Sequence, residues 1–220
     1  MMINRIGILV ILLLALANQS SAEEALFTEK VLLLGTHDPR HITFIYNDGE
    51  KLTGVHVDVK HSLLWDLDST EGSQWFDVIY SKDKGLTLKH LTKPIEFKLI
   101  SQVTNHPIGR ILKVCYEKVG GSSMGIQRCL DRYDKLLEIE IDRAYQLLKD
   151  NGEDVKELQE SWQKFNQQQS VFIRNFYSKV SGSKWAYKSS QDIVKLDISH
   201  LNTLSGLLES LYINSTNSVY

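Results

Sequence analysis

The chain has 220 residues, and its 25 Lys and Arg nearly balance its 27 Asp and Glu, leaving a formal net charge of −2. This balance argues against a nucleic-acid-binding surface, which needs clustered positive charge. The length suits one larger domain or two small ones.

The N-terminus has the pattern of a secretory signal peptide. Arg5 precedes an apolar run over residues 6–17, and Ser20 and Ala22 are small enough for a cleavage site before Glu23. The run of 12 residues is well below the roughly 20 that a membrane-spanning helix needs, which disfavours an uncleaved anchor. We therefore predict a signal peptide at residues 1–22, a periplasmic or secreted location and no stable membrane span.

Residues 23–104 are expected to form a β-rich domain. β-branched and aromatic runs flank Asp48-Gly49, a strong hairpin signal, and the arrangement recurs around residues 82–85. Residues 27–34 and 95–100 are further strand candidates. Short strands with turn signals predict a small antiparallel sheet or a partial barrel, and the pattern leaves the strand order open.

Residues 105–220 are expected to form a helical domain, because the period changes between Ser101 and His106. Apolar residues then recur in steps of three or four, which places them on one face of a helix. The three runs are Leu130, Tyr133, Leu137, Ile141, Ala144 and Leu148; then Val155, Leu158, Trp162, Phe165, Gln169, Phe172 and Phe176, in which Gln169 is the one polar position; and finally Val194, Ile198, Leu201, Leu204, Leu208 and Leu211. A break at residues 150–152 makes the first two helices antiparallel neighbours, and we expect their aromatic side chains to face the core.

The two cysteines of the chain, Cys115 and Cys129, are expected to form a disulfide. An even count in an exported protein favours pairing over a catalytic thiol, which would leave the other cysteine free in an oxidising compartment. The predicted fold class is therefore α+β, with a small antiparallel β-rich N-terminal part followed by a disulfide-linked helical hairpin or bundle.

The helical part resembles the LprI-like family of small exported proteins, named for a lysozyme-inhibiting member, over residues 106–211. The resemblance rests on the cysteine pair and on matching positions in both helices of the hairpin. These positions are Met124, Glu138, Asp142, Tyr145, Gln159, Trp162 and Phe165. The chain departs from the family pattern at Glu138, where Asp is usual, at Ile141-Asp142, which stands in place of Leu-Asn, and at Asn166-Gln167, where an Arg-Asp pair is usual. The resemblance implies an all-helical domain and a protein partner, with lysozyme as the specific candidate.

Other candidate sites have ordinary structural explanations. His56 and Asp58 would share one face of a strand while His61 points to the other, which is poor geometry for a metal site. Ser122 has no identifiable base, and the acidic pair Glu138 and Asp142 flanks an apolar stripe as a solvated helix face does. Neither a catalytic nor a phosphate-binding motif is found, and no cofactor or metal is expected.

We predict an exported, non-enzymatic interaction protein. The alternatives are a periplasmic ligand-binding or envelope-maintenance module, with its ligand site in the β-rich half, and, less favoured, a hydrolase.

Overall fold

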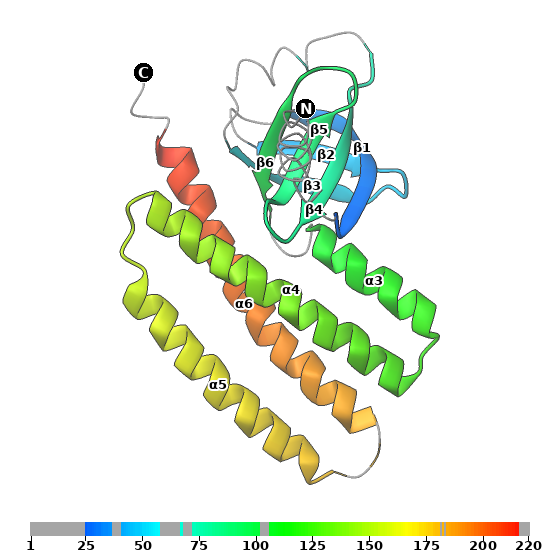
Figure 1. Cartoon of the computed structure of the whole chain (residues 1–220), viewed down its shortest axis with the longest axis vertical. Coiled ribbons are helices and arrows are strands. Elements are labelled where there is room, and N and C mark those ends of the chain that lie inside the picture. Colours follow the sequence, from blue (N-terminus) through cyan, green and yellow to red (C-terminus); the bar gives the residue numbers. More distant parts are fainter. Residues whose placement is uncertain are drawn as a thin grey trace, which may run out of the picture.

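The computed structural model confirms the α+β class, with an antiparallel β-barrel followed by helices (Figure 1). The structure describes residues 25–36, 41–57, 67, 72–101, 106–180, 182 and 184–215. The expected signal peptide at residues 1–22 lies outside these residues. The strands are β1 (Phe27–Thr36), β2 (His41–Tyr46), β3 (Lys51–Val57), β4 (Trp75–Ser81), β5 (Gly85–His90) and β6 (Glu96–Ile100). The helices are α3 (Pro107–Val119), α4 (Ser123–Asp150), α5 (Lys156–Ser178) and α6 (Lys184–Ser215).

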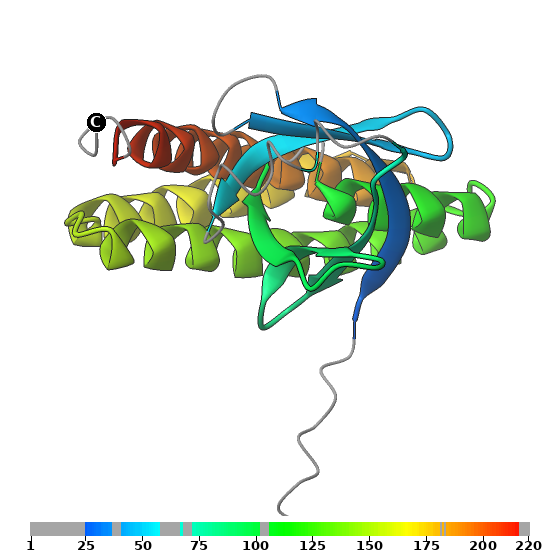
Figure 2. The ribbon, with the colours of Figure 1, turned by 90° about the horizontal axis from the view of Figure 1, so that it is seen from above.

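The barrel closes in the order β1-β2-β3-β6-β5-β4, with β1 pairing with both β2 and β4 (Figure 2). Both predicted hairpins form, and Gly49 takes the positive φ of 87° that the β2–β3 turn requires. Side chains fill the interior. Phe76 is in edge-to-face contact with Phe44 and Phe97, at centroid distances of 5.2 and 5.9 Å. All three rings are buried, so the inside of the barrel is a packed core.

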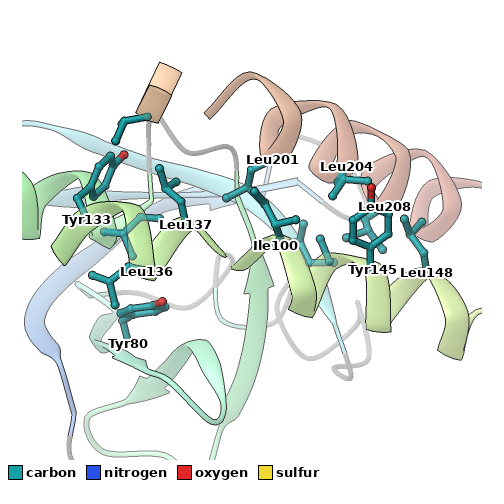
Figure 3. Close-up of a cluster of buried hydrophobic side chains, with 14 of the residues drawn as sticks. Tyr80, Ile100, Tyr133, Leu136, Leu137, Tyr145, Leu148, Leu201, Leu204 and Leu208 are labelled. Carbon is teal, nitrogen blue, oxygen red and sulfur yellow. The ribbon is translucent and has the colours of Figure 1, made fainter. Parts of the chain in front are cut away.

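The helical core lies mainly between α4 and α6, and it continues into the barrel (Figure 3). Leu137 of α4 and Leu204 of α6 are both completely buried. Tyr80 of β4 and Ile100 of β6 belong to the same cluster. Every member of the first predicted apolar stripe is buried, as its helical spacing indicated.

An arginine of α3 links that helix to the barrel. Arg110 pairs with three carboxylates of the β1–β3 region: Glu29 at 3.0 Å, Asp48 at 2.9 Å and Glu50 at 2.5 Å. Its guanidinium also lies 3.9 Å from the centre of the Tyr46 ring, a cation–π contact. The pKa of the Asp48 carboxyl is lowered, chiefly by its hydrogen bond with Arg110.

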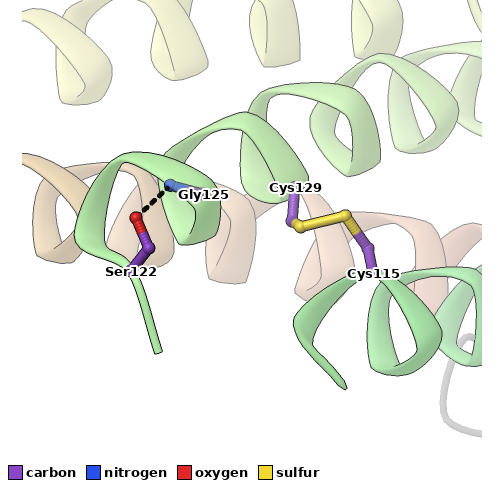
Figure 4. The surroundings of a disulfide bond; sticks show 4 residues. All are labelled: Cys115, Ser122, Gly125 and Cys129. Atoms are coloured by element: carbon purple, nitrogen blue, oxygen red, sulfur yellow. Dashed lines mark hydrogen bonds between the residues drawn. A yellow bond between two sulfur atoms is a disulfide. The ribbon is translucent and has the colours of Figure 1, made fainter. Parts of the chain in front are cut away.

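The predicted disulfide is present and joins α3 to α4 (Figure 4). The Cα atoms of Cys115 and Cys129 are 5.8 Å apart. Between them, Gly120 adopts φ 57° at the end of α3, and Ser122 caps α4 by accepting a hydrogen bond from the Gly125 amide at 3.3 Å. The helix α3 lies in the expected helical domain of residues 105–220, but it is not one of the three predicted helical runs.

The prediction that the aromatic residues of α5 face the core is wrong for three of them. Phe165, Phe172 and Phe176 are 45, 65 and 55% exposed, and Leu158 is 45% exposed. Only Trp162 of this aromatic set is partly buried. The reason is that α5 packs against α6 through a neighbouring, more polar face, on which Asn166 donates to Asp197 Oδ1 at 2.8 Å.

Candidate functional site

The main candidate site is a groove of about 500 Å³ between α4 and α5, with one residue of α6 in its lining. We call it the α4–α5 groove. In Figure 1, α5 lies on the side of α4 that faces away from the barrel. The groove is lined by Glu138, Ile141, Asp142 and Tyr145 of α4, by Gln159, Trp162, Gln163, Asn166, Gln167, Ser170, Val171 and Arg174 of α5, and by Asp197 of α6.

Most of the family-motif positions meet in this groove. The five that line it are Glu138, Asp142, Tyr145, Gln159 and Trp162. Two of them belong to α5 and three to α4. Their spacing within each helix could not show that the two sets line the same groove. The other two positions lie elsewhere: Met124 is 67% exposed at the start of α4, and Phe165 lies on the exposed apolar side of α5.

A histidine of α6 joins the two aromatic motif residues. The ring of His200 stacks on Trp162 with centroids 3.8 Å apart and ring planes at 12°, and His200 Nε2 lies 2.8 Å from the Tyr145 hydroxyl. Burial lowers the pKa of His200 to about 4, so the imidazole is neutral at physiological pH. His200 was not among the predicted site residues, because only the packing of α4, α5 and α6 brings the three side chains together.

Two carboxyl groups share a hydrogen bond beside the groove. Asp197 of α6 is only 2% exposed, and burial together with the charge of Asp134 raises its pKa to about 7. The pKa of Asp134 is raised mainly by burial as well, while its hydrogen bond with Asp197 acts in the opposite direction. A protonated Asp197 thus donates to the Asp134 carboxylate. Burial and the charges of Asp134 and Asp142 also raise the pKa of Glu138, and Arg174 adds one positive charge to the lining of the groove.

The change Asp197→Asn is expected to stabilise the protein at pH 8 by about 1–2 kcal/mol. The folded-state pKa of about 7 exceeds the ordinary aspartate pKa of 3.8, so the folded wild type binds the extra proton and loses stability as the pH rises between these values. Asparagine keeps the acceptor for Asn166 and supplies a donor for Asp134 without titrating. Urea unfolding from pH 3.5 to 8 measures the difference, which should vanish at the acidic end. A variant less stable than the wild type at pH 8 would contradict this account.

A second cavity of about 420 Å³ lies where the barrel meets α4 and α6. Its polar centre is Glu140 of α4, which accepts a hydrogen bond from the Tyr80 hydroxyl at 3.0 Å and pairs with Arg143. His106 lies 3.9 Å from the same carboxylate, and burial, with the nearby Arg143 charge, lowers its pKa to about 3. His106 also caps α3 by accepting from the Ile108 amide. We interpret this network as the polar joint between the two halves of the molecule.

The remaining sequence candidates are placed as follows. His56 lies in β3 with its ring against Phe97, whereas Asp58 and His61 fall outside the described residues. In the part of the chain that the structure describes, no group of three or more His, Cys, Asp and Glu side chains is arranged to hold a metal ion. None of the helices described is both long enough and apolar enough to cross a membrane.

Comparison with protein-family models, with curated proteins and with solved structures gives no match to this chain.

Proposed function

We propose that this protein is an exported, non-enzymatic interaction protein that binds a protein partner in the α4–α5 groove, with lysozyme as the specific partner suggested by the LprI-like resemblance. The observation that carries the proposal is the meeting of five motif positions from two helices in one groove. Residues that served only to pack the hairpin would be buried, yet Glu138 and Asp142 are exposed.

The chemistry of the groove indicates what the partner presents. Glu138 and Asp142 supply negative charge at the α4 wall, and Gln163 and Gln167 supply amide donors and acceptors at the α5 wall. Arg174, farther along α5, adds one positive charge to the lining. Such a surface suits a protruding segment that carries a Lys or Arg, because the carboxylates accept hydrogen bonds from the cation and the amides complete them. An inhibitor acts by occluding a cleft, which needs shape and a few anchor residues but no catalytic groups.

The filled barrel bears on the alternative of a ligand-binding module. The β-rich half was the expected ligand site under that alternative, yet Phe44, Phe76 and Phe97 occupy the interior of the barrel. The groove between the helices therefore supports a binding function better than the barrel does.

Charge reversal in the groove should abolish or strongly weaken inhibition. The chain without residues 1–22 is mixed with several lysozymes, and lysis of a bacterial suspension is followed by turbidity. Glu138→Lys should raise the concentration for half-inhibition at least about tenfold, which corresponds to about 1.4 kcal/mol. Glu160→Lys is the matched control, because Glu160 is exposed on α5 and does not line the groove.

An unchanged lysis rate at excess wild-type protein would exclude lysozyme as the partner. In that case, capture experiments with wild-type, Glu138→Lys and Glu160→Lys proteins test the groove itself. A partner retained by the wild type and the control but lost by Glu138→Lys supports the groove. Equal retention by all three proteins would contradict it.

A further inference from the structure

The exposed apolar side of α5 repeats with the period of a coiled-coil seam. Its positions are Leu158, Trp162, Phe165, Gln169, Phe172 and Phe176, which we call the α5 seam. The steps alternate strictly between four and three residues, the spacing of a and d positions in a heptad. Four of the six side chains are at least 45% exposed, and no element in the described part of the chain covers them.

The packing of α5 on α6 makes this exposure unusual. The face of α5 against α6 is held by polar contacts, including Tyr177 to Asp192 at 2.6 Å and Asn166 to Asp197 at 2.8 Å, and by the stacking of Trp162 on His200. The more apolar face is thus turned outward on the helix that lies farthest from the barrel (Figure 1). Exposed apolar surface of this kind marks an interaction site.

The seam is complementary to itself when it is reversed. If two α5 helices pack antiparallel with a two-fold axis at the level of Gln167, every a position meets a d position. The layers pair Leu158 with the partner's Phe176, Trp162 with the partner's Phe172, and Phe165 with the partner's Gln169. Each layer then holds at least one aromatic ring, and no layer opposes two glutamines.

The flanks of the seam carry no charge that would oppose self-pairing. The positions beside it are Gln159, Ser161, Asn166, Gln168, Ile173 and Asn175. Like charges facing each other across a two-fold axis would destabilise a dimer, and here none do. A helix that binds a lipid surface is instead rich in Lys and Arg on its polar face, whereas the charges of α5 are of both signs: Lys156, Lys164 and Arg174 are basic, and Glu157 and Glu160 are acidic.

We propose that two copies of this chain associate through their α5 seams, packed antiparallel about a two-fold axis. The axis passes at the level of Gln167 along the helix, although the Gln167 side chain itself is outside the seam. The 23 residues of α5 span roughly 35 Å, enough for three heptads. With half-exposed aromatic side chains on both copies, the contact buries roughly 1,000 Å², at the low end of specific interfaces. The dimer is therefore of modest affinity. Of the seam positions only Trp162 also lines the α4–α5 groove, and the other groove residues of α5 lie outside the seam.

A single cysteine tests both the association and its direction. Gln168 is exposed beside the seam, and the antiparallel two-fold places it across from the partner's Gln168. Because Cys115 and Cys129 are already bonded, Gln168→Cys adds the one free thiol, and mild oxidation should give a covalent dimer. Gln167→Cys is the matched control, since Gln167 is also exposed but lines the groove, and it should stay monomeric. If Gln169→Cys formed the covalent dimer and Gln168→Cys did not, the two helices would be parallel, and the stated geometry would be overturned.

Sedimentation equilibrium of the chain without residues 1–22 provides a second test that does not depend on thiols. The wild type should show a monomer–dimer equilibrium in the range of about 10–100 μM, as expected for a small interface. Phe172→Glu should weaken the dimer at least tenfold while leaving the helical circular dichroism unchanged, because Phe172 is 65% exposed. A wild type that is monomeric at about 1 mM, or a dimer unaffected by Phe172→Glu, would overturn the proposal. Neither result would change the lysozyme assay, which tests the groove.

Discussion

Replacing Leu137 by alanine is expected to lower the free energy of unfolding by about 3–5 kcal/mol, the largest effect that we predict for a single residue. Leu137 is completely buried on α4, in the cluster that unites α4 and α6 with Tyr80 and Ile100 of the barrel. Truncation removes apolar contacts and leaves a cavity that helices on one side and a barrel on the other cannot easily close.

Urea unfolding followed by far-ultraviolet circular dichroism measures this loss. Leu207→Ala is the matched control, because Leu207 is on α6 but 45% exposed, and its truncation should cost less than about 1 kcal/mol. Equal effects of the two substitutions would mean that the helical core is not centred between α4 and α6.

Removal of the disulfide should cost about 3 kcal/mol. Cys115 and Cys129 are 14 residues apart, and opening this loop restores conformational freedom to the unfolded chain. The double change Cys115→Ser and Cys129→Ser should therefore lower the midpoint of thermal unfolding while most of the helical signal remains, since α4 and α6 keep their mutual contacts.

Comparison with the reduced wild type separates the bond from the substitution. Cys129 is 2% exposed, so a serine hydroxyl there adds a burial cost that reduction of the wild-type protein does not. Reduced wild type should thus lie between the oxidised wild type and the double variant. An unchanged midpoint in both would show that the bond contributes nothing to stability.

The local elements were predictable because their signals are local. Asp48-Gly49 marks the β2–β3 turn, and the stripe from Leu130 to Leu148 marks the buried face of α4. The cysteine pairing was predicted from the count of two cysteines together with the expected signal peptide. Each of these inferences depends on backbone preferences or on side-chain spacing within one segment.

The candidate site was only half predictable for the opposite reason. The spacing of Glu138, Asp142 and Tyr145 places them on one side of α4, but it contains no information about which helix faces that side. His200, which connects Tyr145 with Trp162, lies 38 residues beyond Trp162 and has no local signal of its own. The second apolar stripe was correctly recognised as one helix face, yet its period could not show that Phe165 and Phe172 would remain exposed.

The α+β class, both β-hairpins, the amphipathic faces of the long helices and the disulfide could be predicted from the residues alone, because side-chain period and turn chemistry are properties of short segments. Three features depend on long-range packing: the closure of the barrel through β1–β4 and β3–β6 pairing, the groove between α4 and α5, and the outward orientation of the α5 seam. The physical reason is that a periodic apolar pattern shows which residues share a face, whereas burial depends on which distant segment covers that face. In the described part of the chain, no other segment covers the apolar face of α5 that carries Phe165, Phe172 and Phe176. That exposed face is the basis of the proposed dimer.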